Sequence, residues 1–162
     1  MHPPRTSQFL SFTRRPWVVE VVVFFLVLWQ EDIRLQLRTA AVQLPVPQAF
    51  QALYYYRFGD FANGYVNAFL VDGVVDLGLS YWRASGSRSL ETSGLLGLRS
   101  RAGFAALLSA LSIVLYEVFV PGLARADWLD VPAGVLGALV YLGVRVAAIT
   151  WRTRLGTDVA RP

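Results

Sequence analysis

Charged residues with the chemistry of a binding site gather around one short segment of the chain. Residues 117–137 read EVFVPGLARADWLDVPAGVLG and carry three carboxylates and one guanidinium, at Glu117, Arg125, Asp127 and Asp130. Asp60 is expected to join this outer-face cluster. An arginine flanked by carboxylates could bind a lipid headgroup, an anionic saccharide phosphate or a divalent cation. The same charges could also neutralise one another without a ligand, and this second interpretation is favoured.

A second charged set lies inside strongly apolar segments and comprises Glu20, Asp72, Asp76 and Arg145. Asp72 and Asp76 are four residues apart and share a helix face. At about 1.5 Å of rise per residue, Asp76 and Arg145 reach nearly the same depth from the ends of their segments. Charges in a membrane need a partner or a task. The sequence predicts a structural Asp76–Arg145 pair in preference to a proton or ion relay.

The elements that would position these residues are four apolar segments of near-bilayer length. The chain of 162 residues is 55% hydrophobic and only 16% charged, with a mean hydropathy of +0.45. Predicted spans cover about 17–33, 61–81, 103–120 and 131–151, each near the roughly 20 residues that a helix needs to cross the hydrocarbon. The sequence therefore predicts an all-α membrane protein, a four-helix transmembrane bundle that forms one domain over 1–162.

The arginine distribution predicts the orientation of this bundle. Ten arginines lie before the first span, between the second and third spans, or after the fourth, whereas four lie in the other two loops. Positive residues are retained in the cytoplasm, so the N- and C-termini and the loop 82–102 are predicted to be cytoplasmic. The loop 34–60 is then an outer loop, with a short helix or re-entrant element at 50–58. All five tryptophans lie beside predicted span ends, as expected at a membrane interface.

Helix packing is predicted at the start of the fourth span. Asp130 can cap a helix whose first turn contains Pro132. Gly134 and Gly137 give that helix a smooth face on which another helix can pack closely.

Several function classes are excluded or disfavoured. The chain has no cysteine, which removes disulfides, thiolate metal sites and cysteine catalysis. No Ser/His pair, zinc-protease motif or phosphate-binding glycine loop occurs. No enzyme activity, metal or other cofactor is predicted, and Arg125 argues against an all-carboxylate metal site. Nucleic acid is not an expected partner because the sequence has no basic stripe with interleaved aromatics.

The residues Glu117, Arg125, Asp127, Asp130 and Gly137 match, in order and spacing, a motif of one membrane-protein family. The chain resembles the VanZ-like family of small bacterial membrane proteins, in which a Glu ends the penultimate helix and an Arg leads into Asp-x-x-Asp and a later Gly. The family's Asn position is Gly134 here. Its Phe-x-Pro-x-Gly motif is matched by Phe69 and Gly73 without the proline. Some members are linked to glycopeptide resistance, so the resemblance implies a role at the cell envelope.

Two functions are therefore expected in the bacterial inner membrane, where the lipid bilayer is the first partner. Use of Arg for every basic residue is consistent with a bacterial genome rich in G and C. The first function is a VanZ-like protein of undefined activity that binds lipid-linked or glycopeptide-like molecules at its outer face. The alternative is a small accessory or assembly subunit of a larger membrane complex.

Overall fold

The described part of the chain is entirely helical. The computed structural model describes residues 18–84, 94–119 and 130–159. They form four α-helices without a strand: α2 spans Val18–Thr39, α3 spans Gln48–Ala84, α4 spans Gly94–Phe119 and α5 spans Asp130–Val159. The prediction of an all-α chain with four helices is confirmed.

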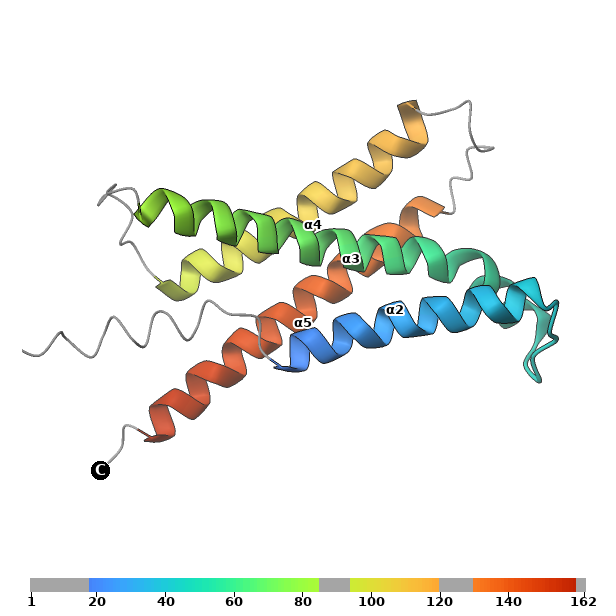
Figure 1. The fold of residues 1–162 in the computed structure, drawn as a ribbon, viewed down its shortest axis with the longest axis horizontal. Helices are drawn as coiled ribbons and strands as arrows, with labels where there is room; N and C mark the ends of the chain where they lie inside the picture. The colour runs from blue at the N-terminus through green and yellow to red at the C-terminus, as the bar shows by residue number, and fades with distance from the viewer. Residues whose placement is uncertain (1–17, 85–93, 120–129, 160–162) are drawn as a thin grey trace, which may run out of the picture.

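Successive helices run in opposite directions, as short connections between long helices require (Figure 1). The start of α2, the end of α3, the start of α4 and the end of α5 therefore lie at one end of the bundle. The opposite end, which contains the connection 40–47, is called the turn end below. Helices α3 and α5 are central and both contact α4, whereas α2 packs mainly against α3 and makes a smaller contact with α5.

The segment predicted as an outer loop, 34–60, is mostly helical. Helix α2 continues to Thr39, and residues 48–60 are the first turns of α3. The aromatic stretch 50–58 is therefore part of one long helix, not a separate surface element. Only residues 40–47, which include Pro45 and Pro47, interrupt the helices. Both prolines lie where the backbone must leave one helix and enter the next, since proline disrupts a helix interior.

Helix α2 ends in a left-handed turn that is attached to α3. Ala41 has a φ of 52°. The amide of Val42 donates to the Leu37 carbonyl at 3.0 Å, and the amide of Ala41 donates to the Arg38 carbonyl at 3.1 Å. This is the hydrogen-bond pattern of a Schellman motif, which satisfies the last carbonyls of a helix. The Tyr55 hydroxyl on α3 donates to the Val42 carbonyl at 2.7 Å, which holds the turn against the next helix.

Helices α3 and α5 cross with their backbones in contact. A Cβ atom built on Gly64 of α3 would overlap the Gly134 carbonyl of α5, with the carbonyl carbon 2.7 Å away. A Cβ on Gly137 would overlap the Phe61 carbonyl and lie 2.9 Å from the Tyr65 amide nitrogen. Gly134 and Gly137 thus lie at the crossing, where the predicted smooth face meets a third glycine. Such small-residue contacts are typical of helices that associate within membranes.

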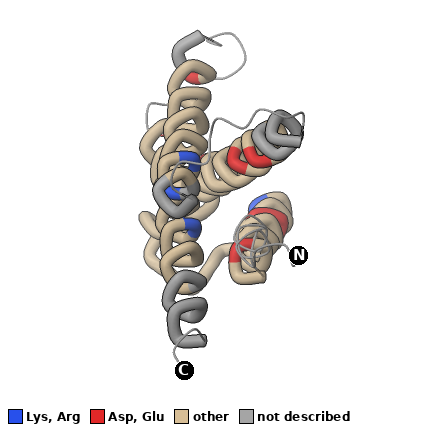
Figure 2. Tube along the Cα trace, turned by 90° about the vertical axis from the view of Figure 1, so that its left-hand side faces the viewer, with Lys and Arg blue, Asp and Glu red and all other residues tan. Residues whose placement is uncertain are grey.

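The interior of the bundle contains small and polar side chains, whereas large aliphatic side chains face outward. Alanine makes up most of the buried apolar residues, and Ile149 is the one large aliphatic among the buried residues in the described ranges. Exposed large hydrophobic residues occur on all four helices. In Figure 2, acidic and basic residues form isolated bands on otherwise uncharged helices. This distribution is the reverse of a water-soluble core and suits a lipid environment.

Two of the described helices are long and apolar enough to cross a membrane. These segments are Arg99–Glu117 in α4, with 19 residues, and Asp130–Trp151 in α5, with 22 residues. They correspond to the third and fourth predicted spans.

Candidate functional site

Charged side chains from all four helices meet inside the bundle. We call Glu20, Asp72, Asp76, Arg101 and Arg145 the buried ionic network. Glu20 is 2% exposed, and Asp72 and Arg145 are each 4% exposed. Nη1 of Arg145 donates to both oxygens of Glu20, at 2.7 and 2.6 Å. Its Nε lies 3.1 Å from Oδ2 of Asp72, so the Arg145 guanidinium bridges α2, α5 and α3.

Arg101 continues this network from α4. Its Nε donates to Oδ1 of Asp72 at 2.7 Å, and its Nη1 donates to Asp76. The Tyr141 hydroxyl donates to the other Asp72 oxygen at 2.6 Å. Charges therefore alternate in sign from Glu20 to Asp76, and each carboxylate has a guanidinium partner. Nε of Arg145 and Nη2 of Arg101 are buried without a hydrogen-bond partner in the described part of the chain, but the pairing of every carboxylate with a guanidinium favours a structural role over a proton or ion relay.

The network contains the predicted charged residues but pairs them differently from the prediction. Arg145 contacts Glu20 and Asp72, whereas Asp76 contacts Arg101. An Asp76–Arg145 pair was predicted from the depth of each residue along its helix. That comparison ignored the direction in which each side chain points around the helix axis. It also placed Arg101 in the cytoplasmic loop 82–102, since the apolar run begins only at Gly103. Helix α4 begins earlier, at Gly94, and carries Arg101 into the bundle.

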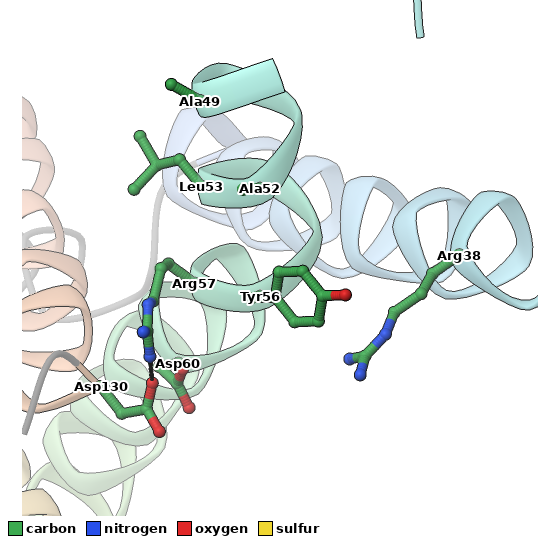
Figure 3. A pocket seen from close by; sticks show the side chains of 8 residues that line it. All are labelled: Arg38, Ala49, Ala52, Leu53, Tyr56, Arg57, Asp60 and Asp130. Atoms are coloured by element: carbon green, nitrogen blue, oxygen red, sulfur yellow. Dashed lines mark hydrogen bonds and ion pairs between the residues drawn. The ribbon is translucent and has the colours of Figure 1, made fainter. Parts of the chain in front are cut away.

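At the turn end, part of the predicted outer-face cluster lines a pocket. This charged pocket has a volume of about 550 Å³, and eight residues line it: Arg38, Ala49, Ala52, Leu53, Tyr56, Arg57, Asp60 and Asp130 (Figure 3). Asp60 and Asp130, which are 70 residues apart in sequence, lie close enough for Asp130 to raise the pKa of Asp60, and Glu117 also affects Asp60 electrostatically. Arg125 and Asp127 lie outside the described residues.

Arg57 is a guanidinium of this pocket that the sequence did not predict there. It forms a salt bridge with Asp130 across the α3–α5 interface. Arg57 was counted only as an outer-loop arginine, although a short helix or re-entrant element was predicted at 50–58. A helix that extends through 48–60 brings Arg57 and Asp60 onto adjacent turns of one face, which is the signal that could have identified it.

Asp60 has a perturbed ionisation equilibrium. It lies at the turn end, outside the predicted span 61–81. Burial and the neighbouring Asp130 carboxyl raise the pKa of Asp60 to about 6, and Arg57 opposes the rise. The charged pocket therefore changes its charge near neutral pH.

An apolar groove adjoins the charged pocket. Its volume is about 870 Å³, and α2, the connection 40–47, α3 and α5 all contribute to it. Fourteen residues line it: Gln30, Ile33, Leu37, Leu44, Val46, Phe50, Leu53, Tyr54, Arg57, Phe58, Phe61, Pro132, Ala133 and Leu136. Leu53 and Arg57 line both cavities, so the groove and the pocket adjoin at these two side chains.

A buried arginine fixes the wall of the groove. Arg34 of α2 donates to Glu31 through Nε at 2.7 Å and through Nη2 at 2.5 Å, and its Nη1 donates to the Tyr55 carbonyl of α3. A Cβ on Gly59 would lie only 3.0 Å from the Arg34 guanidinium. The absence of a side chain at Gly59 therefore lets Arg34 hold the end of α2 against α3.

The two cavities at the turn end are better suited to binding a ligand than to holding a metal ion. Within the described residues, no group of three or more Asp, Glu or His side chains could hold a metal ion.

Comparisons with protein-family models, curated proteins and solved structures found no match to the chain.

Proposed function

We propose that the chain is a multi-pass protein of the bacterial inner membrane that binds a lipid at its outer end. The acyl chains lie in the apolar groove and the headgroup lies in the charged pocket. The proposal keeps the cell-envelope role that the VanZ-like resemblance implies and gives it a physical site.

The adjacency of the two cavities carries this proposal. An apolar groove of about 870 Å³ meets a charged pocket of about 550 Å³ at Leu53 and Arg57. A ligand that fills both must be apolar at one end and charged at the other, as membrane lipids are. Ligand sites commonly combine an apolar wall with a few polar groups that fix orientation.

Four membrane spans are part of the proposal. Helices α2 and α3 carry charges within their apolar segments, but Glu20, Asp72 and Asp76 are all paired with arginines of other helices, which lowers the cost of placing them in lipid. Both helices expose large apolar side chains, with Val18, Val22, Phe25, Leu26 and Trp29 exposed on α2 and Leu70, Val74 and Leu77 exposed on α3. The arginine distribution then directs the turn end to the outer side.

Cysteine labelling tests this topology, and the absence of native cysteine makes it simple. Gln43 lies in the exposed connection 40–47, and Gly97 is exposed near the start of α4. In intact spheroplasts, Gln43→Cys is expected to react with a membrane-impermeant maleimide, and Gly97→Cys is expected to react only after lysis. The opposite pattern would reverse the orientation, and equal labelling before lysis would show that α3 does not cross the membrane.

Filling the groove tests lipid binding. Native mass spectrometry would count the phospholipids that the detergent-purified protein retains after incubation with mixed phosphatidylethanolamine and phosphatidylglycerol. Leu136→Trp places a bulky ring in the groove and is expected to reduce retention about tenfold, which corresponds to roughly 1.4 kcal/mol. Leu139→Trp is the matched control, because Leu139 is on the same helix, is 55% exposed against 54% for Leu136, and does not line the groove. Equal retention by the two variants contradicts the proposed site.

A further inference from the structure

The charged pocket has opposite charges at its two ends. In Figure 3, the Arg38 guanidinium lies on one side, the Asp60 and Asp130 carboxyls lie on the other, and the Tyr56 ring stands between them. The Arg38 guanidinium carbon is 4.9 Å from the centre of the Tyr56 ring. Stacking occupies the face of a guanidinium and leaves its N–H edge able to bind an anion.

Carboxylates outnumber guanidinium groups at the other end. Arg57 pairs with Asp130. The adjacent Asp60 carboxyl is close to both Asp130 and Glu117, and these two acidic neighbours raise its pKa. A positively charged ligand group at Asp60 would relieve this repulsion, whereas an anionic group there would increase it.

We propose that the lipid bound at this site is a phospholipid with a primary ammonium headgroup, such as an ethanolamine phospholipid. Its phosphate binds the Arg38 guanidinium, and its ammonium group binds Asp60 and Asp130. This inference rests on the proposed function and names the chemical class of its ligand.

The donor chemistry of the headgroup explains why a primary amine is selected. A primary ammonium group has three N–H donors that can bond the oxygens of two adjacent carboxyls. A choline headgroup carries the same charge but has no N–H, so it cannot form these bonds. A glycerol headgroup has no cation and leaves the carboxylates to repel each other. The expected order of affinity is therefore ethanolamine, then choline, then glycerol phospholipid.

The selection should depend on pH through the carboxyls that face the ammonium group. Asp60 is the group whose titration matters. The charged groups that interact with it electrostatically are Asp130 of α5, Arg57 of α3, Glu117 of α4 and Arg34 of α2. An ammonium ion binds the ionised carboxylate. Its retention should therefore fall as pH decreases from about 7.5 to about 5, through the pKa of Asp60. The retention of a glycerol phospholipid should not fall over the same range.

Competition in native mass spectrometry tests the inference. The wild-type chain in detergent is offered equal amounts of dipalmitoyl phosphatidylethanolamine, phosphatidylcholine and phosphatidylglycerol. At pH 7.5 the ethanolamine lipid is expected to be retained at least about tenfold over the glycerol lipid. Asp60→Asn should remove most of this preference, and Arg38→Ala should weaken all three lipids. Asp32→Asn is the matched control, because Asp32 is an exposed carboxylate at the same end of the bundle that accepts a hydrogen bond from Gln36.

The outcomes separate this inference from the proposed function. Equal retention of the three lipids by the wild-type chain overturns the headgroup selection but leaves lipid binding intact. Retention of none of them overturns both. The comparison of lipids on the wild-type chain needs no substitution, so a variant that fails to fold does not affect the result.

Discussion

Gly137→Ala is expected to disrupt the helix bundle, although it adds only one methyl group. The new Cβ would overlap the Phe61 carbonyl and lie 2.9 Å from the Tyr65 amide nitrogen. Both neighbours are backbone atoms of α3, so no side-chain rotation can make room. Helices α3 and α5 would have to separate along their whole crossing, at a cost of about 3 kcal/mol or more. The measurement is the melting temperature in detergent, together with the monodisperse fraction in size-exclusion chromatography.

Gly143→Ala is the matched control for this prediction. Gly143 is on the same helix, and a Cβ there would have no atom within 4 Å. Alanine is up to about 1 kcal/mol more favourable than glycine within a helix, so this variant should be unchanged or slightly stabilised. If the two alanine variants melted at the same temperature, α3 and α5 could not be in backbone contact at Gly137.

Arg145→Met is expected to cause the second large loss of stability. It removes the guanidinium that bridges Glu20 and Asp72, and these carboxyls are 2% and 4% exposed. Removing one partner of a buried ion pair costs about 3–5 kcal/mol, because it leaves an uncompensated charge. Thermal unfolding in detergent, followed by circular dichroism, would measure the loss.

A second substitution separates the charge effect from lost packing. Glu20→Gln added to Arg145→Met removes the carboxylate that has lost its Arg145 guanidinium, so the double variant should recover part of the lost stability. Asp72 still has its contact with Arg101 in this double variant. Arg99→Ala serves as the control, since Arg99 is exposed and its hydrogen bond to Thr150 is at the surface; its effect should be within about 0.5 kcal/mol. A double variant no more stable than Arg145→Met would show that Glu20 and Arg145 are not energetically coupled.

The sequence predicted the helical class of the fold because apolar runs of near-bilayer length can hardly form anything else. It was wrong for much of the segment 34–60, which it described as an outer loop with only a short helix or re-entrant element at 50–58, because charged residues such as Arg34 and Arg57 interrupt the apolar pattern. Those charges are tolerated because they pair with one another or with residues of a neighbouring helix. A hydropathy pattern shows where a charged residue lies in the sequence, but it does not show which residue of opposite charge pairs with it in the fold.

The sequence predicted which charged residues lie near one another better than it predicted which of them form ion pairs. Asp60 and Asp130 were expected at the same end of the bundle, and they share one pocket. The roles of Arg38, Arg57 and Arg101 were missed, because the rotation of each helix about its axis decides which charges meet. Rotation follows from contacts such as the Gly64–Gly134 crossing, and these depend on the whole bundle.

The buried ionic network also constrains how the chain is made. Among the four described helices, α2 is synthesised first and α5 last, yet Glu20 of α2 finds its guanidinium on Arg145 of α5. In the proposed four-span topology, the Arg145 partner of Glu20 arrives only with α5, and a charge is less costly near the aqueous boundary than in lipid. The proposed topology therefore implies that the final packing of α2 against the bundle waits for the last helix.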